Sequence, residues 1–325
     1  MHAGKTGLLA VAVALTLSVP GWAQQGVPPE IAAQLRAIGP VIDVPAVARL
    51  YAPLQAEAPR EGVKRTNDVH YGPDERNRLD VYEPATHPAQ PMPVLVFIHG
   101  GGFVRGDKST PGTPFYDNIG YYFARHGVLA ILATYRLAPA HPWPAGARDV
   151  GAVVHWTRAN AARFGGDRHR IVLWGHSAGA AHAAAYALDA RFQLPPGPRL
   201  AGLILMAGVY DPVLEMRAAE QFSGSHPQES DAAYYGTDMR SYAAKAPIRH
   251  LTGPKLPVML IVSELDPPMM HVETGELFAA LCQRDHQCPT LVTPRDHDHI
   301  SEAYAINTPD DSVSGPALAF IQAAK

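Results

Sequence analysis

Ser177 lies in a pattern that prepares a hydroxyl for nucleophilic attack. The pentapeptide 175–179 (GHSAG) follows an apolar run at 171–174 and precedes an alanine-rich run typical of a helix. A serine between a strand and a helix, with glycine two positions before and two after it, is the nucleophile elbow. The tight turn strains the serine backbone, and the helix N-terminus behind it offers free N–H groups to an oxyanion. Ser177 is therefore the candidate nucleophile.

A second glycine-rich stretch, 99–103 (HGGGF), comes directly after the apolar run 94–98. Consecutive glycines let backbone N–H groups approach a ligand closely, as an oxyanion hole requires. The stretch has neither the G-x-G-x-x-G spacing of a dinucleotide site nor the Gly-Lys-Ser/Thr of a P-loop. We predict that Gly101, Gly102 and Ala178, the residue after the nucleophile, donate to the oxyanion. His99 is expected to brace the loop rather than to act on substrate.

A nucleophilic serine needs a base, and the base needs an orienting carboxylate. In folds that carry a nucleophile elbow, the acid follows the serine and precedes the histidine in the chain. The apolar run 258–262 is followed by Glu264 and Asp266, and Asp211 follows an earlier strand. We prefer Asp266 because it stands further past the strand end, where the chain turns at two prolines.

Two histidines follow the last predicted strand, at 290–293. His297 and His299 both stand where the base is required, and Asp296 and Asp298 alternate with them. Alternating histidines and aspartates are also ordinary metal ligands. No further cluster of Cys, His or Glu lies nearby in the sequence, so we expect neither a metal nor another cofactor.

The composition restricts the possible partners. The chain has 325 residues, of which 47% are hydrophobic, with a net charge of −3. This charge gives no reason to expect nucleic acid or an anionic membrane as a partner. The length suits a single large α/β domain.

The first 23 residues have the pattern of a secretory signal peptide. A weakly basic start precedes an apolar stretch at 8–19, and small residues before Gln24 predict cleavage after Ala23. The apolar stretch is shorter than the ~20 residues that span a membrane, so no stable anchor is expected. We therefore predict export to the periplasm or the medium, where a disulfide between Cys282 and Cys288 becomes plausible.

The remaining pattern predicts the elements that position these residues. Residues 63–71 and 78–82 read as two strands, and from residue 94 onward strands alternate with helices, which indicates a mostly parallel sheet covered on both faces. Residues 24–60 are predicted as an amphipathic helical cap segment ahead of an α/β catalytic domain at 61–325. Residues 211–250 interrupt the alternation and are a candidate cap insertion.

Three stretches together resemble the hormone-sensitive-lipase-like esterases of the α/β-hydrolase superfamily. They are HGGGF at 99–103, YRLAPAHPWPAGARDV at 135–150 and GHSAGA at 175–180, and the resemblance covers about residues 65–325. It implies the α/β-hydrolase fold, with Ser177, Asp266 and a histidine as the triad. In such proteins a bulky apolar residue and a small one follow the catalytic histidine, which favours His299.

The resemblance implies a carboxylesterase that hydrolyses small-molecule esters of short or medium acyl chains. His176 departs from the pattern, because aspartate often precedes the serine in this family. Histidine there is similar to feruloyl-esterase and arylformamidase relatives, so amide or formamide hydrolysis and feruloyl-type esters are alternatives, and a non-catalytic binding protein is a remote one. Candidates for either the pocket lining or the core are Phe103, Tyr116, Tyr121, Tyr122, Trp143 and Met269.

Overall fold

The computed structural model describes residues 26–214 and 229–325. The predicted signal peptide and part of the 211–250 segment lie outside the described residues. An eight-stranded sheet with the order β1-β2-β4-β3-β5-β6-β7-β8 organises the chain. The strands are β1 (Val63–His70), β2 (Arg78–Pro84), β3 (Met92–Ile98), β4 (Leu129–Ala133), β5 (Gly166–His176), β6 (Gly202–Met206), β7 (Val258–Ile261) and β8 (Thr290–Val292).

All strands of the sheet except β2 point in the same direction. β1 pairs antiparallel with β2, and β2 pairs antiparallel with β4, whereas all later pairs are parallel. Every residue of β3, β4 and β6 is buried, as expected for strands covered on both faces. In the β3–β5 register Ile98 lies opposite Gly175, so the glycine-rich loop and the candidate nucleophile leave the sheet side by side.

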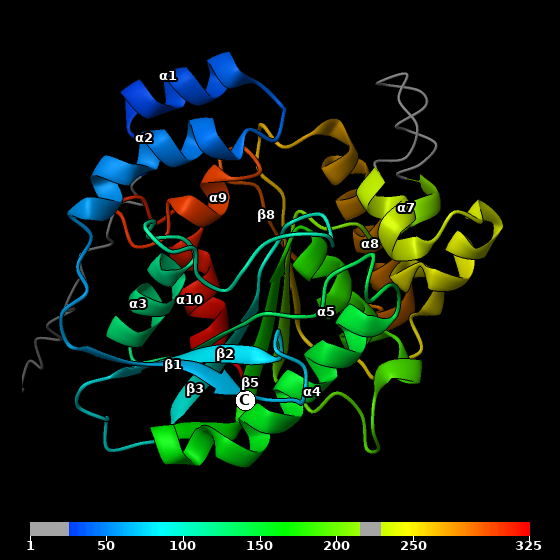
Figure 1. The fold of residues 1–325 in the computed structure, drawn as a ribbon, viewed down its shortest axis with the longest axis horizontal. Coiled ribbons are helices and arrows are strands. Elements are labelled where there is room, and N and C mark those ends of the chain that lie inside the picture. The colour runs from blue at the N-terminus through cyan, green and yellow to red at the C-terminus, as the bar shows by residue number, and fades with distance from the viewer. Residues whose placement is uncertain (1–25, 215–228) are drawn as a thin grey trace, which may run out of the picture.

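Helices cover both faces of this sheet (Figure 1). α3 (Asp117–Arg125) and α10 (Ser314–Ala323) pack on one face, whereas α4 (Ala145–Asn160), α5 (Ala178–Leu188) and α8 (Pro268–Asp285) pack on the other. Each face has its own apolar cluster, because alternate residues of one strand point to opposite sides: Phe97 joins one cluster and Ile98 the other. The α/β alternation predicted from the sequence therefore forms a layered sheet.

Further helices lie near the carboxyl ends of the strands. α1 (Pro29–Ile38) and α2 (Val44–Ala56) form the helical segment predicted before the first strand, and α2 lies against α9 (Ser301–Tyr304) (Figure 1). Gln55 Nε2 fixes α2 by donating to the carbonyl oxygens of Tyr304 and Ile306, at 2.8 and 2.7 Å. On the other side α7 (Glu229–Tyr235) packs on the glycine-rich loop, where Tyr234 stacks on Phe103.

Short 3₁₀ turns complete the connections. They are η1 (Ala161–Phe164), η2 (Ala190–Phe192), η4 (Met239–Lys245) and η5 (Pro247–His250).

Within the described part of the chain, no helix combines the length and the apolar character needed to cross a membrane.

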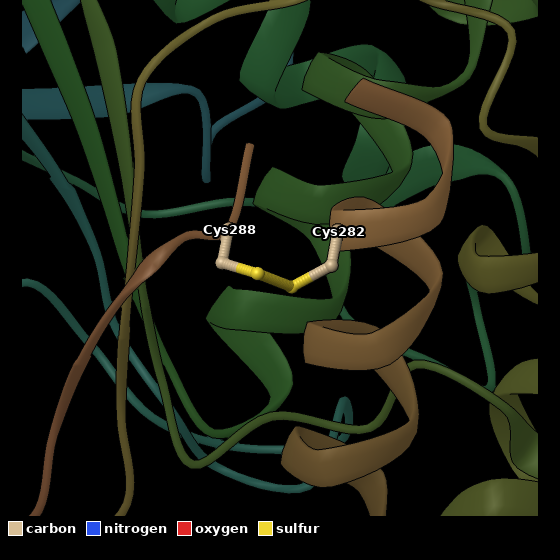
Figure 2. Close-up of a disulfide and its surroundings, with 2 residues drawn as sticks. All are labelled: Cys282 and Cys288. Atoms are coloured by element: carbon tan, nitrogen blue, oxygen red, sulfur yellow. A yellow bond between two sulfur atoms is a disulfide. The ribbon is translucent and has the colours of Figure 1, made fainter. Parts of the chain in front are cut away.

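Cys282 and Cys288 form a disulfide (Figure 2). Cys282 lies in the last turn of α8, and Cys288 lies two residues before β8. Their Cα atoms are 4.2 Å apart, and the bond closes the loop between the helix and the strand. The bond therefore holds α8 to the edge strand that leads toward the candidate histidines.

Some elements extend beyond the sequence prediction. β5 begins at Gly166 rather than at residue 171, because its first half is polar and partly exposed and carries no apolar run. The sequence pattern predicts a helix at about 271–283, whereas α8 begins at Pro268, since proline is tolerated in the first turn of a helix. α3 was not predicted, although Tyr122, Phe123 and Ala124 bury their side chains in the core.

Candidate active site

Ser177 occupies the sharp turn between β5 and α5. Its backbone has φ 55° and ψ −125°, a conformation that L-residues rarely adopt. Both flanking glycines are required by close backbone contacts. A Cβ at Gly175 would lie 2.3 Å from the carbonyl oxygen of Gly179, and one at Gly179 would lie 2.2 Å from that of Ile98. The surrounding backbone therefore holds the Ser177 hydroxyl away from the sheet.

His299 contacts Ser177 directly. Its Nε2 lies 2.9 Å from Ser177 Oγ, and its Nδ1 lies 2.9 Å from Asp266 Oδ1. Since a carboxylate only accepts hydrogen bonds, Nδ1–H donates to Asp266 and Nε2 accepts from the serine hydroxyl. This is the tautomer that a general base needs.

Asp266 is held in the loop after β7. Its Oδ2 accepts a hydrogen bond of 2.6 Å from the backbone N–H of Ser263, which fixes the carboxylate toward His299. The alternative acids lie elsewhere. Glu264 is exposed and accepts from the backbone N–H of Asp296, and Asp211 forms an ion pair with Arg249 at 2.7 Å.

His297 faces away from Ser177. Its Nδ1 lies 3.0 Å from Ser301 Oγ, and its Nε2 lies 2.9 Å from both Ser312 Oγ and Asp310 Oδ2. Both ring nitrogens are therefore engaged in a buried network behind the loop. The structure brings His299, and not His297, to the candidate nucleophile.

The glycine-rich loop lies against Ser177. A Cβ at Gly100 would lie 3.0 Å from the Cβ of Ser177, and Gly101 and Gly102 line the same pocket as the serine. Gly101 has φ 130°, and any side chain there would meet the carbonyl oxygen of Arg105 at 2.1 Å. Ala178 is the first residue of α5, so its N–H has no partner within the helix. The three predicted oxyanion donors therefore surround one pocket.

His99 braces this loop. Its Nδ1 donates to the carbonyl oxygen of Gly100 at 2.6 Å, and its ring stacks on Tyr135 with centroids 4.4 Å apart. Burial lowers the pKa of His99 to about 3, so the ring is neutral at pH 7.

A buried network behind the triad was not predicted from the sequence. His176 Nε2 donates to the backbone carbonyl of His299 at 2.9 Å, and its Nδ1 accepts from the hydroxyl of Tyr116 at 3.1 Å. Glu302 Oε1 lies 3.5 Å from the same Nε2. On its other side, Glu302 Oε2 accepts from Ser263 Oγ at 2.6 Å. Because Ser263 also holds Asp266, the network joins the acid, the base and the residue before the nucleophile.

This network carries little charge. Burial lowers the pKa of His176 to about 3, which keeps the imidazole neutral. Burial, together with the nearby Asp266 carboxylate, raises the pKa of Glu302 well above its ordinary value. Burial therefore favours the protonated form of Glu302 over a second carboxylate beside Asp266.

Among the described residues, nitrogen and oxygen atoms of His176, His299 and Glu302 lie within 4.8 Å of one another, close enough to hold a metal ion. The ring nitrogens are already engaged, however. His176 Nε2 carries the proton donated to His299, and the two nitrogens of His299 contact Ser177 and Asp266. The arrangement thus favours a hydrogen-bonded triad over a metal site.

A pocket of about 220 Å³ opens above Ser177. Of the candidate lining residues, Phe103 and Tyr116 do line it, whereas Met270 rather than Met269 faces it. The start of α2 contributes one wall, and α7 contributes another. The side chains around the glycine loop and the triad are Ile42, Val44, Phe103, Arg105, Tyr116, Val209, Ser230, Asp231, Met270, Ile300 and Tyr304.

A parallel sheet that carries Ser, His and Asp on loops at the carboxyl ends of its strands is the architecture of the α/β hydrolases. The chain belongs to the α/β-hydrolase-fold family, whose model matches residues 95–297. This agrees with the resemblance carried by the HGGGF and GHSAGA stretches.

Curated relatives include two Mycobacterium tuberculosis proteins. Esterase LipC is 38% identical over 134 residues, which are 40% of this chain and 32% of LipC. Esterase LipQ is 29% identical over 230 residues, which are 68% of this chain and 54% of LipQ. The match therefore spans about a third to a half of the length of these relatives.

Solved structures share the fold over most of the chain. A hyperthermophilic esterase from the archaeon Pyrobaculum calidifontis superposes with a TM-score of 0.68, at 20% identity, over 92% of this chain and 98% of that one. Esterase B from Lactobacillus rhamnosis superposes with a TM-score of 0.67, at 20% identity, over 90% of this chain and 95% of that one.

Proposed function

We propose that the protein is a serine carboxylesterase that hydrolyses small-molecule esters through an acyl-enzyme on Ser177. The observation that carries this proposal is the continuous chain of contacts from Ser177 Oγ to His299 and from His299 to Asp266, at 2.9 Å each. Relatives named as esterases support the same reaction.

In the proposed mechanism, His299 Nε2 takes the proton of Ser177 as Oγ attacks the ester carbonyl carbon. Asp266 holds the imidazole and stabilises its charged form. The N–H groups of Gly101, Gly102 and Ala178 stabilise the oxyanion, and loss of one such donor commonly raises the barrier by ~3–4 kcal/mol. His299 then protonates the leaving alcohol.

Deacylation uses the same groups in reverse. Water replaces the alcohol, His299 accepts a proton from it, and the resulting hydroxide attacks the acyl carbon. The tetrahedral intermediate collapses, the carboxylic acid leaves, and His299 returns the proton to Ser177 Oγ. No step needs a metal or an organic cofactor.

The substrates proposed are esters of short or medium acyl chains. The pocket of about 220 Å³ over Ser177 suits a small acyl group. The aromatic rings of Phe103, Tyr116 and Tyr304 offer apolar contacts to that group.

Export is part of the proposal. Residues 1–23 carry the signal-peptide pattern, and the disulfide between Cys282 and Cys288 suits an oxidising compartment. Mass spectrometry of protein recovered from periplasmic and culture fractions should find a chain that begins at Gln24, and a cytoplasmic chain with residues 1–23 intact would refute export.

The test compares single variants on p-nitrophenyl butyrate. Ser177→Ala and His299→Ala should each lose at least about a thousandfold in kcat/KM, since the triad acts as a unit. Only the native enzyme and the His297→Gln control should label rapidly with a fluorophosphonate probe. An active Ser177→Ala protein, or a dead but folded His297→Gln protein, would contradict the proposal. N-formylkynurenine, assayed beside the ester, tests the formamidase alternative.

A further inference from the structure

A second pocket lies away from the active site. It has a volume of about 740 Å³ and shares no lining residue with the pocket over Ser177. The outer side of α4 from Arg148 to Asn160 forms one wall, residues 192–199 form another, and Arg168 at the start of β5 closes one end. We call it the arginine-lined pocket.

Four arginines border this pocket: Arg148, Arg158, Arg168 and Arg199. None of its lining residues is an aspartate or a glutamate. Within the described ranges, no ion pair neutralises any of the four. Arg158 is half-buried, and unlike the half-buried Arg65 and Arg136 it contacts no carboxylate, whereas the other three are exposed at the border of the pocket.

The positive charges lie close enough to affect one another. Arg158 Nη1 donates to the backbone carbonyl of Arg168 at 2.9 Å, which brings these two arginines together. Burial and the charges of Arg199 and Arg168 lower the pKa of Arg158. An anion between these guanidinium groups would relieve their mutual repulsion.

Apart from His155, Asn160 and the tyrosine hydroxyls, the rest of the lining is apolar. Tyr186 is buried, Trp156 and Phe192 are half-buried, and Leu194 leaves 73% of its surface exposed at the edge. Tyr186 also fixes the facing loop, because its hydroxyl donates to the carbonyl of Pro198 at 3.1 Å. The aromatic rings can contact the apolar part of a ligand, and guanidinium groups that have no carboxylate partner can contact its charged group.

We propose that the arginine-lined pocket binds a monocarboxylate with an apolar tail. Guanidinium groups recognise carboxylates through paired N–H donors, and the aromatic and aliphatic wall removes the tail from water. Volumes of about 300–1,000 Å³ are usual for ligand pockets. Aliphatic and aromatic acids share this chemistry. Ester hydrolysis would release such an acid, but the pocket has these properties whether or not the chain catalyses that reaction.

Calorimetric titration of the full chain with octanoate and with 3-phenylpropanoate tests the proposal. At least one of them should bind, and whichever binds more tightly identifies the tail that the pocket prefers. Octanamide, which lacks the charge, should bind at least about tenfold more weakly than octanoate or not at all, and inorganic phosphate alone should not compete at equal concentration.

Variants then locate the binding. Arg168→Gln with Arg199→Asn removes two exposed charges and should weaken binding at least about tenfold, and Leu194→Glu should also weaken it by adding a negative charge at the edge. The matched control, Arg49→Gln with Arg125→Gln, makes a similar charge change outside the pocket and should bind as the native chain does.

Ester hydrolysis should remain unchanged in all of these variants. Absence of binding by both acids, equal binding of octanamide, full competition by phosphate, or unchanged affinity in folded pocket variants would each overturn the proposal. If octanoate bound at the active site instead, its affinity would be unchanged in both pocket variants.

Discussion

Glu302 provides a quantitative test of the electrostatics behind the triad. One of its carboxyl oxygens lies within 4.8 Å of a ring nitrogen of His299. If Glu302 were ionised, Coulomb's law at an effective dielectric constant of about 20 would give about 3.5 kcal/mol of attraction to a protonated imidazole at that distance. Glu302→Gln would then remove this attraction, and the acid limb of the pH–activity profile would move down by roughly 2.5 pH units.

The structure predicts a different result. Burial and the charge of Asp266 raise the pKa of Glu302 well above its ordinary value, which favours the neutral form of the side chain. Glutamine has nearly the same shape and also keeps an acceptor for Ser263 Oγ, which now lies 2.6 Å from Glu302. We therefore expect kcat/KM to change by less than about threefold and the acid limb to stay within about 0.3 pH unit.

The assay measures kcat/KM on p-nitrophenyl butyrate from about pH 5 to about pH 9 for both proteins. Glu302→Ala is the control for structure, because it leaves the buried Ser263 hydroxyl without its partner and should lower the free energy of unfolding by about 1–3 kcal/mol. A downward movement of the acid limb by about two pH units in Glu302→Gln would show an ionised Glu302 and refute the reasoning.

Three further tests concern backbone packing, a buried histidine and the disulfide. Gly179→Ala should destabilise the fold by about 3 kcal/mol or more, since its Cβ would lie 2.2 Å from a backbone oxygen. At Gly275 in α8 an added Cβ would contact no atom within 4 Å, so Gly275→Ala should stabilise the fold by up to about 1 kcal/mol. Urea unfolding measures both changes. The pKa of His182 is lowered to about 3 by burial, so below its ordinary pKa of 6.5 the unfolded chain binds a proton that the native chain does not. Native stability relative to His182→Gln should therefore fall by about 2 kcal/mol between pH 7 and pH 5, and a constant difference across that range would contradict a neutral buried imidazole. Replacing Cys282 and Cys288 by serine should lower the free energy of unfolding by about 2 kcal/mol, and reductant should then no longer affect the melting temperature.

Much of the fold could be predicted from local sequence because each signal has a local physical cause. The continuous apolar run at residues 94–98 corresponds to β3, which is buried on both faces. Gly175 is required by a contact within the elbow itself, whereas Gly179 is required by the end of the neighbouring strand β3. The order of candidate acid and histidine along the chain follows from the order of parallel strands. Glu264 and Asp266 differ by two positions in one loop, and only the backbone N–H of Ser263 decides which carboxylate is held inward.

The network behind the triad could not be predicted in this way. Tyr116, His176 and Glu302 are far apart in the chain and meet only when α3, β5 and α9 pack together. The sequence did carry one indication of this network: His176 stands where related esterases commonly have aspartate before the nucleophile. A neutral ring at His176 suits a site in which burial also favours the neutral form of Glu302.

Part of the wall of the pocket over Ser177 is free to change in evolution without disturbing the packing of the fold. Ile42, just before α2, and Val44, the first residue of α2, line the pocket but belong to none of the apolar clusters that hold the helices on the sheet. Ile42 and Val44 also remain largely accessible to solvent. Inherited changes at these two positions would therefore reshape the pocket over Ser177 with little effect on the packing of the fold, so ligand selectivity and foldability can evolve as separate traits.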